Sequence, residues 1–561
     1  MQTAVAPEAS LLERYRPLLV LICSSAPSFM LQLDTNIVAV SLPSISASLK
    51  ANFAGIEWVV TAYTLSFASL LLPAGALADR FGRKRVLIIG LGVFTAASFF
   101  CGAAPNLATL IAARAFQGVG AAMQLSAALA TLSSFFKGDE RARAFAFWGS
   151  VVGAGIAMGP IVGGLITQTF GWEWAFYINL PVGMITLALV AAIVTDTRDP
   201  DAVRFDLPGV STFSAFLFLT TLALISGNHD GWTSPHILAE GIGALLFLVL
   251  FIIVEKREAR PMVDFVFFRR PTYLGANLAQ FTFAASLLTM LTFIPIYFQH
   301  ALGLSPRQSG LAMLPMALPL LFVPRIVTVQ LSHRLTGRTL LTIGLALVSI
   351  GLAFVALVTG NGDYRWMLVG MLITGLGAGL LNGETTKVGM TVIPPERAGM
   401  ASGISGTMRF TGIVIGFAAL GVALFSRISS VITTALPAVD STARFEFIRE
   451  VASGNLSGNG LTSTATPALR ALALESYTKG YATLFAIAAA LCLVATVLTW
   501  WLVRDADTQP IAKRQLRTGE AVGAAAIVAT ASSKVVSVPG LKKPTLGNVA
   551  GGASARFPAA D

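Results

Sequence analysis

Long apolar segments without a charged residue recur along most of this 561-residue chain, and they limit its possible folds more than any other feature. A helix needs about 20 residues to cross the hydrocarbon core of a bilayer, and the segments reach that length. Only 12% of the residues are charged, whereas a soluble domain carries roughly 25%. The sequence therefore predicts an all-α polytopic membrane protein.

Charged or Gly/Pro-rich breaks divide the apolar segments into fourteen predicted spans. These spans cover residues 17–43, 55–78, 86–104, 107–136, 143–170, 174–195, 207–226, 236–254, 272–299, 308–331, 338–359, 366–392, 401–426 and 480–503.

The basic residues indicate how these spans are oriented. Lys and Arg gather in the loops ADRFGRKR, KGDERARA, EKREARPMVDFVFFRR, SHRLTGRT and PPERAG, which all fall on one side, while APNL, GNHDGW and GNGDYRW on the other side nearly lack them. Because basic loops stay in the cytoplasm, we expect a multi-pass protein of the plasma (inner) membrane with both termini cytoplasmic. These loops explain the net charge of +11, so no nucleic-acid partner is expected.

A short internal repeat indicates a duplicated architecture. LADRFGRKRVLIIGL, from Leu77 to Leu91, aligns without a gap with LSHRLTGRTLLTIGL, from Leu331 to Leu345. The first copy joins predicted spans two and three, and the second joins spans ten and eleven. Two six-helix halves separated by two extra helices would give this offset. Duplicated halves are typical of secondary transporters that move around a site near the membrane midplane.

The predicted domains follow from this duplication. They are a cytoplasmic N-terminus (1–16), an N-terminal six-helix bundle (17–195), two extra transmembrane helices with cytoplasmic linkers (196–271), a C-terminal six-helix bundle (272–503) with a long outer loop (427–479), and a disordered cytoplasmic tail (504–561). Within the outer loop, ARFEFIREVA and TPALRALALESYTKGY are candidates for short helices.

Several short motifs lie between about Leu31 and Arg504: LDTNIVAVSLP, WVVTAYTLS, GALADRFGRKR, ARAFQGVGAA, GIAMGPIVGG, WEWAFYINLPVG and MASGISGTMRFTG. Together they resemble the motifs of the major facilitator superfamily, in particular its fourteen-span drug:proton antiporters of the EmrB/QacA type. The resemblance implies the major facilitator fold, with two six-helix bundles and two additional transmembrane helices. It also implies a proton-coupled secondary active transporter that exports hydrophobic or cationic drugs or toxic compounds by alternating access.

Asp34 and Arg114 are the first candidates for proton and substrate coupling, because charges within spans are costly and mark functional sites. Counted from the outer ends of their spans, Asp34 lies ~12 Å deep and Arg114 ~10 Å deep at a rise of ~1.5 Å per residue. Proton:drug exchange requires an acid that alternately binds a proton and pairs with an arginine or a cationic drug. The alternative is a static structural ion pair.

Glu384 and Arg409 form a second candidate set for coupling, each ~12 Å from the cytoplasmic surface by the same helical rise. Lys387 follows Glu384 by one helical turn and could pair with it or extend toward the membrane surface. The sequence does not decide between a structural ion pair and a coupling site for these residues. Glu57 and Glu173 lie at outer ends of spans, where solvated caps are expected.

The segment GALADRFGRKR is expected to act as a conformational latch and not as a substrate site. Gly75 allows close backbone approach, Gly82 permits a tight reversal, and Asp79 can pair with helix N-termini or basic groups of the opposite half. The residues that anchor the loop on the cytoplasmic face are Arg80, Arg83, Lys84 and Arg85. The resemblance implies a latch that stabilises one transport state; the alternative is a loop whose charges only set the topology.

The run GSVVGAGIAMGPIVGGLI combines six glycines with one proline in the predicted fifth span. On a helical wheel one face is almost bare backbone, which suits close helix packing. This face holds Gly149, Gly153, Pro160, Gly163 and Gly164, with Gly155 and Gly159 beside it. Pro160 removes one helical hydrogen bond and permits a bend. The resemblance places this helix at the seam between the two halves.

The sequence contains neither a phosphate-binding Gly-Lys motif nor a cluster of metal ligands, so we expect no enzyme, cofactor or metal site, and the proton gradient drives transport. Expected partners are small hydrophobic or cationic substrates, protons and the lipid bilayer, with a periplasmic adaptor and outer-membrane channel in a Gram-negative source. Three alternatives remain: a proton-coupled exporter of one specific metabolite, antibiotic or siderophore; an inward solute:proton symporter; and a non-transporting sensor.

Overall fold

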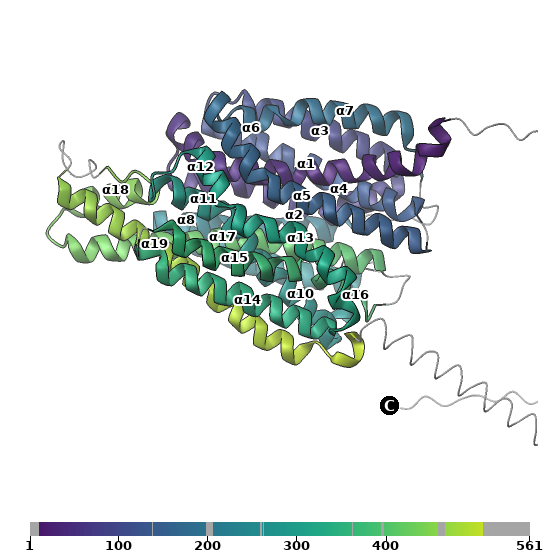
Figure 1. Ribbon diagram of the computed structural model, residues 1–561. Helices are drawn as coiled ribbons and strands as arrows, with labels where there is room; N and C mark the ends of the chain where they lie inside the picture. The colour runs from purple at the N-terminus through teal and green to yellow at the C-terminus, as the bar shows by residue number, and fades with distance from the viewer. Residues whose placement is uncertain are drawn as a thin grey trace, which may run out of the picture. The chain divides into compact units, whose positions relative to one another are not determined.

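The computed structural model describes residues 11–136, 138–197, 206–258, 261, 263–361, 363–393, 398–457 and 466–508. All regular structure in these residues is helical. Thirteen of the helices are long and apolar enough to span a membrane, and one bent pair raises the number to fourteen. Their number agrees with the fourteen predicted spans. Figure 1 shows the long helices lying side by side, with α18 at one end and the start of α1 at the other.

The first half of the chain forms one helical bundle, in which α1 packs on α4, α5 and α7, and α4 packs on α2 and α3. Its helices are α1 (Leu11–Leu49), α2 (Phe53–Phe81), α3 (Arg83–Gly102), α4 (Leu107–Phe135), α5 (Gly138–Phe170), α6 (Trp174–Tyr177) and α7 (Asn179–Ile193). Two further helices, α8 (Leu207–Asp230) and α9 (Pro235–Arg257), pack on each other, and α8 also contacts α2 and α17.

The second bundle contains several interrupted helices. Its elements are η1 (Phe265–Arg269), α10 (Pro271–Phe283), η2 (Ala284–Leu288), α11 (Thr289–His300), α12 (Pro306–Ala312), α13 (Leu314–Val329), η3 (Leu331–His333), α14 (Gly337–Val358), η4 (Thr359–Asn361), α15 (Tyr364–Leu381), α16 (Glu384–Met390), α17 (Ala398–Ala435), α18 (Ser441–Ala452), α19 (Pro467–Leu502) and η6 (Asp505–Thr508). The predicted span 366–392 is broken between α15 and α16, because Gly383 adopts a φ of +90°. The predicted span 308–331 bends by 42° between α12 and α13.

The internal repeat corresponds to equivalent elements of the two bundles. The helices α3 and α14 begin at Arg83 and Gly337, which the repeat aligns with each other. The glycine that both copies share also packs in the same way. A Cβ on Gly90 would lie 3.1 Å from the carbonyl oxygen of Gly120 in α4, and one on Gly344 would lie 3.2 Å from that of Gly377 in α15. Each bundle therefore has a close glycine contact between its third and fourth spans.

The segment 427–479, predicted as a long outer loop, is mostly helical where it is described. The helix α17 continues to Ala435, α18 covers the predicted short helix ARFEFIREVA, and α19 starts at Pro467 and runs without a break into the last span. The prediction that TPALRALALESYTKGY is a separate short helix is therefore wrong. It is the first part of a 36-residue helix.

The two predicted terminal segments lie largely outside the described residues, which begin at Leu11 and end at Thr508. The first residues of the predicted tail are ordered, because Asp505–Thr508 form η6. Asp505 Oδ2 accepts a hydrogen bond from Arg338 Nη1 at 3.0 Å, and Asp507 Oδ2 accepts one from Thr272 at 2.6 Å. These bonds tie the end of α19 to the starts of α14 and α10.

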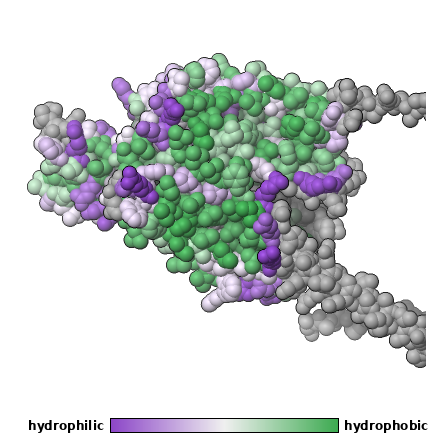
Figure 2. All heavy atoms as spheres, viewed as in Figure 1, coloured by the Kyte–Doolittle hydropathy of each residue, from purple (hydrophilic) through white to green (hydrophobic). Residues whose placement is uncertain are grey.

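Apolar side chains cover much of the outer surface between the two ends. Figure 2 shows this apolar surface in green, with polar residues concentrated toward both ends of the visible face. Large side chains such as Ile242 on α9, Leu357 on α14 and Trp501 on α19 are more than two-thirds exposed. Exposed apolar surface on this scale is what a bilayer covers. We call the end with Arg83, Lys84 and Arg85 the basic end, and the opposite end the α18 end.

Candidate functional site

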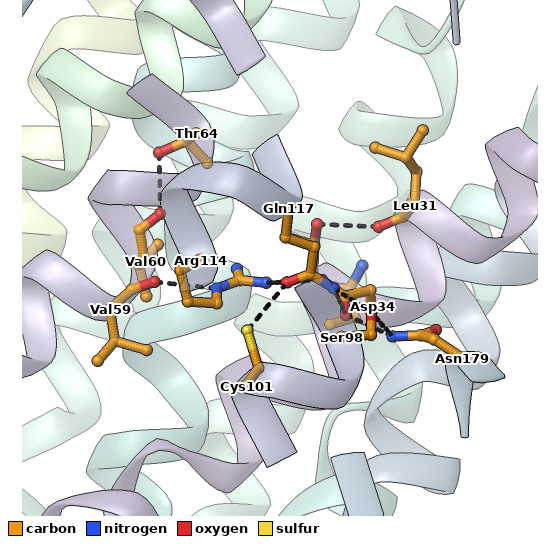
Figure 3. Close-up of polar contacts among 12 residues, drawn as sticks. Leu31, Asp34, Val59, Val60, Thr64, Ser98, Cys101, Arg114, Gln117 and Asn179 are labelled. Atoms are coloured by element: carbon orange, nitrogen blue, oxygen red, sulfur yellow. Dashed lines mark hydrogen bonds and ion pairs between the residues drawn. The ribbon is translucent and has the colours of Figure 1, made fainter. Parts of the chain in front are cut away.

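The centre of the first bundle holds a buried ion pair between Asp34 of α1 and Arg114 of α4 (Figure 3). Arg114 Nη1 donates to Asp34 Oδ2 at 2.8 Å. The two side chains are 0% and 1% exposed. The two residues predicted to lie at similar depth are thus in direct contact.

Neutral polar side chains surround this pair and complete the hydrogen bonding of Asp34. Asp34 Oδ1 accepts from Gln117 Nε2 at 2.9 Å and from Asn179 Nδ2 at 2.7 Å. Gln117 also accepts from Arg114 Nη1 at 2.6 Å and donates to Ser98 Oγ at 2.7 Å. The carboxylate therefore has three donors, which offset much of the cost of burying its charge.

Arg114 is held by further contacts that fix the direction of its guanidinium group. Its Nε donates to the carbonyl oxygen of Val59 in α2 at 3.1 Å. The guanidinium carbon lies 4.2 Å from the ring centroid of Tyr63 and 5.8 Å from that of Phe176. Aromatic faces stabilise a cation at such distances. The network thus joins α1, α2, α3, α4, α6 and α7.

The arrangement makes Arg114 the charge partner of Asp34 across two helices. The ionised carboxylate is stabilised by Arg114, whereas a protonated carboxyl loses most of this attraction and frees the guanidinium group. Because the pair joins α1 to α4, a change in protonation alters how these two helices are held together. A buried proton acceptor coupled to helix packing is what a proton-driven conformational change needs.

Sequence reasoning missed Gln117, Asn179 and Ser98. Two of them lie inside motifs that the sequence displays plainly, Gln117 in ARAFQGVGAA and Asn179 in WEWAFYINLPVG. Gln117 follows Arg114 by three residues, which places it on the same helix face. Uncharged polar residues at the depth of a buried charge are therefore a usable signal.

The second candidate set is only partly brought together. Glu384 is buried and pairs with Lys387 Nζ at 2.6 Å, and Ser332 Oγ donates to the same carboxylate oxygen at 3.2 Å. The side chain of Lys387 is 49% exposed. Arg409, on α17, makes no hydrogen bond or ion pair with the residues that the structure describes.

The predicted latch residues make their contacts within the first bundle. Asp79 pairs with Arg83 Nη2 at 2.9 Å, Arg85 with Asp196 at 3.3 Å, and Lys84 Nζ donates to the carbonyl oxygen of Ala191 at 2.7 Å. Among the residues that the structure describes, Asp79 has no partner in the opposite half.

The remaining latch residues have simpler surroundings. Gly82 has a φ of +108° and forms the single-residue turn between α2 and α3, as its predicted role requires. Arg80 is exposed and lies against the ring of Phe81. Its guanidinium carbon is 5.3 Å from the centroid of that ring. The nearest described atom to a Cβ on Gly75 is the Cβ of Ser126 at 4.0 Å, so no described backbone approaches Gly75 closely.

The glycines of α5 face two different neighbours. Gly155, Gly159 and Gly163 pack on α1 of the same bundle; a Cβ on Gly163 would lie 2.8 Å from the Cα of Ile37. Gly163 thus belongs with Gly155 and Gly159, not with the face assigned to it from the helical wheel. The helix runs through Pro160 as one element.

The other face of α5 lies against the second bundle. A Cβ on Gly164 would lie 3.0 Å from the Cα of Arg307 in α12, and one on Gly153 would lie 3.2 Å from the carbonyl oxygen of Leu320 in α13. Gly310 of α12 packs on the carbonyl oxygen of Pro160. Toward the basic end, Gly149 has no described neighbour within 4 Å of its Cβ position.

Further contacts between the bundles also lie toward the α18 end. Gln299 Nε2 of α11 donates to the carbonyl oxygen of Val40 in α1 at 2.8 Å. The backbone amide of Arg307 donates to Gln168 Oε1 of α5 at 3.3 Å. Near the middle of the molecule, the ring centroids of Phe67 in α2 and Phe410 in α17 lie 3.9 Å apart. The bundle interface is therefore closed from its middle to the α18 end.

Glu57 does not have the solvated position predicted for it. Its side chain lies in α2 near the α18 end and is only 4% exposed, because α17 covers it at Gly421. Glu173 is partly exposed, as a residue at a span end should be. Among the described residues, no three His, Cys, Asp or Glu side chains are placed to hold a metal ion.

Comparison with known proteins identifies the family of this helical assembly. The family model described as Major Facilitator Superfamily matches residues 27–417. The chain belongs to this superfamily. It is 33% identical over 501 residues to the multidrug resistance protein Stp of Mycobacterium tuberculosis (strain CDC 1551 / Oshkosh), an alignment that covers 88% of this chain and 93% of Stp. It is also 36% identical over 429 residues to the methylenomycin A resistance protein of Streptomyces coelicolor. That alignment covers 76% of this chain and 89% of the resistance protein.

Solved structures show the same superfamily fold. A bacterial homologue of the human lysosomal transporter Spinster, solved in an inward-facing and unoccupied conformation, superimposes with a TM-score of 0.60 at 14% identity. The superposition covers 88% of this chain and 98% of that protein. The major facilitator fold predicted from the sequence motifs is therefore confirmed, and the chain is a multi-pass membrane transporter and not an enzyme.

Proposed function

We propose that this major facilitator protein is a proton-coupled exporter of small hydrophobic or cationic compounds that works by alternating access. The observation that carries the proposal is the buried Asp34–Arg114 pair, whose two side chains are at most 1% exposed. Such a pair within a membrane-spanning bundle is costly and is retained where charge movement is part of function. Stp, described as a multidrug resistance protein, supports export as the direction.

The proposed orientation places the basic end in the cytoplasm of a cell with a plasma (inner) membrane, and both termini with it. The positive-inside bias of the loops supports this orientation. The closed α18 end then faces outward, so a substrate would enter from the cytoplasmic side, at the basic end.

A transport cycle follows from these contacts. Protonation of Asp34 would weaken its bond to Arg114 and loosen α1 against α4. For antiport, Asp34 takes up this proton from the outside while the α18 end is open and releases it to the cytoplasm once that end is closed, which restores the pair with Arg114. Because α1 also carries Val40, which accepts the bond from Gln299, the state of this pair is linked to the contacts that close the α18 end. The segment 75–85 is proposed to latch the basic end in the opposite state, where its charged residues could reach the second bundle.

A narrower function is the second candidate. The methylenomycin A resistance protein and the cephamycin export protein CmcT of Amycolatopsis lactamdurans, which is 36% identical over 407 residues, are each named for a single antibiotic. An exporter of one antibiotic or metabolite would use the same proton-coupling residues. In both cases we propose that the proton gradient alone drives transport, with no cofactor. An adaptor and outer-membrane channel are partners only in a Gram-negative cell.

Transport by the purified full chain in proteoliposomes tests the proposal. A pH-sensitive dye inside the vesicles reports protons while ethidium and a panel of antibiotics, including methylenomycin A, are added in turn. We expect at least one compound to move against its gradient while protons move in the opposite direction, and a protonophore to abolish this uptake. Proton movement in the same direction as substrate would indicate a symporter. An absence of proton movement with every compound would favour a sensor.

A further inference from the structure

Glu57 is a buried acid that the proposed coupling at Asp34 does not use. It lies in the first turns of α2, the helix that begins at Phe53 after the N-cap Asn52. Its side chain is 4% exposed. The position is close to the α18 end, in the part of the bundle interface that is closed.

None of the described residues forms an ion pair with the carboxyl group of Glu57. Among the described residues, no hydrogen-bond donor reaches its buried Oε1 atom. The group packs directly against the bare backbone of Gly421 in α17, where any Cβ would collide with Oε1. The carboxyl therefore lies between the two bundles, on the surface along which α2 meets α17.

Two small cavities adjoin Glu57 and show which other helices approach it. One is lined by residues of α2, α8, α17 and α18, including Leu224 and Arg449. The other is lined by residues of α1, α2, α11 and α17 and by the end of α18, including Ser46 and His300. Arg449 and His300 are thus the titratable groups that line these cavities besides Glu57. Arg449 is already paired with Glu446 at 3.0 Å.

The surroundings decide which protonation state fits this conformation. An ionised carboxylate that is buried without a cation or donors is strongly destabilised, whereas the neutral acid is tolerated much better. Separation of α2 from α17 would uncover the group to water at the α18 end, and the ionised form would then be favoured. Closing this end therefore favours the protonated form of Glu57, and opening it removes that preference.

We propose that Glu57 is a second proton-binding site of the transporter, which holds a proton while the α18 end is closed and exchanges it with the outside when that end opens. This inference rests on the proposed function, because it assumes that the two bundles separate during transport. It assigns the two acids different roles. Asp34 is paired with Arg114 in the closed state, whereas Glu57 is neutral there.

Infrared spectroscopy tests the protonation state without any substrate. The purified full chain in lipid is compared with Glu57→Gln, Asp34→Asn and the partly exposed control Glu173→Gln at neutral pH. We expect the carbonyl stretch of a protonated carboxyl in the wild type, its loss in Glu57→Gln, and its retention in the other two variants. A wild-type spectrum without this band, or a band that persists in Glu57→Gln, would overturn the proposal.

Transport measurements test the exchange step. With ethidium, or the first compound that the wild type moves, Glu57→Gln should reduce efflux driven by a pH gradient about tenfold, the scale of a coupling between two sites. Substrate counterflow without a gradient should be retained, and Glu57→Asp should restore coupling. Unchanged gradient-driven efflux in Glu57→Gln would overturn the exchange role, while a wild type without proton coupling would refute the proposed function and leave the spectroscopic result standing.

Discussion

Two acid–base pairs of similar length lie in the two bundles, and they differ in almost every other respect. Asp34 meets Arg114 at 2.8 Å across two helices, with both side chains at most 1% exposed. Glu384 meets Lys387 at 2.6 Å one turn along the same short helix, with Lys387 49% exposed. Water reaches Lys387, although Glu384 itself is buried, whereas it reaches neither Asp34 nor Arg114 in this conformation. The first pair can therefore couple protonation to helix packing, whereas the second is better suited to stabilising the short helix α16.

The largest expected difference between the pairs is in stability. Arg114→Ala leaves the Asp34 carboxylate buried without its cation, so we expect the free energy of unfolding to fall by about 3–5 kcal/mol. Lys387→Ala should cost less, about 1–2 kcal/mol, because that cation is half exposed and the buried Glu384 carboxylate keeps its hydrogen bond from Ser332. Unfolding of the purified variants in detergent measures both values. The double variant Asp34→Asn with Arg114→Ala should recover part of the loss, since no buried charge remains.

The distinction between the two pairs is wrong if Lys387→Ala destabilises the protein as much as Arg114→Ala does. In that case exposure would not decide the strength of the two pairs, and the second bundle would contain a coupling site of equal weight.

A smaller effect is expected when one neutral donor is removed from each pair. Asn179→Ala deletes the 2.7 Å hydrogen bond to Asp34 Oδ1 and should cost about 1.5 kcal/mol, because a bond to a buried ionised group is lost. Ser332→Ala deletes the 3.2 Å bond to Glu384 and should cost about 0.5 kcal/mol. The same unfolding measurement applies, and a larger loss in Ser332→Ala would contradict the assigned order.

The sequence predicts that Asp34 and Arg114 lie at a similar level, and their direct contact agrees with this, because the level depends only on counting residues along apolar helices. It does not predict that Glu57 is buried, because the cover over the end of α2 comes from Gly421, more than three hundred residues away in the chain. Gln117 and Asn179 are uncharged, so the cost of charges within spans does not point to them, although a buried charge needs such partners.

The difference between local sequence patterns and tertiary contacts also explains which features of the fold could be predicted. Span number and the repeat follow from local patterns, and both agree with the structure. The break at Gly383, the two faces of α5 and the ordered start of the predicted tail depend on which helices meet. Tertiary contacts of this kind have no local signature in the sequence.

The smallest expected effect concerns a third carboxylate, outside the membrane, which extends the comparison to a fully exposed group. Asp440 caps α18, and the backbone amides of Ala443 and Thr442 lower its pKa below the ordinary value of 3.8. A lowered pKa in the folded state gives stability that is present above the ordinary value and is lost as the pH falls through the folded value. We expect the hydrogen-exchange protection of the first turn of α18 to decrease in that acid range. Asp440→Asn should remove this pH dependence, and an identical acid response in the variant would contradict the assignment to Asp440.

The most direct test of the central claim compares the two acids in one transport assay. Asp34→Asn and Glu384→Gln are each nearly isosteric and remove only the charge and the titration. In inverted vesicles with an imposed pH gradient, Asp34→Asn should lower ethidium efflux, or that of the first compound the wild type moves, by about a hundredfold, with normal expression and membrane insertion. Glu384→Gln should stay within about twofold of the wild type, because this pair lies within one short helix and its cation is half exposed. Normal gradient-driven efflux by Asp34→Asn would contradict the account.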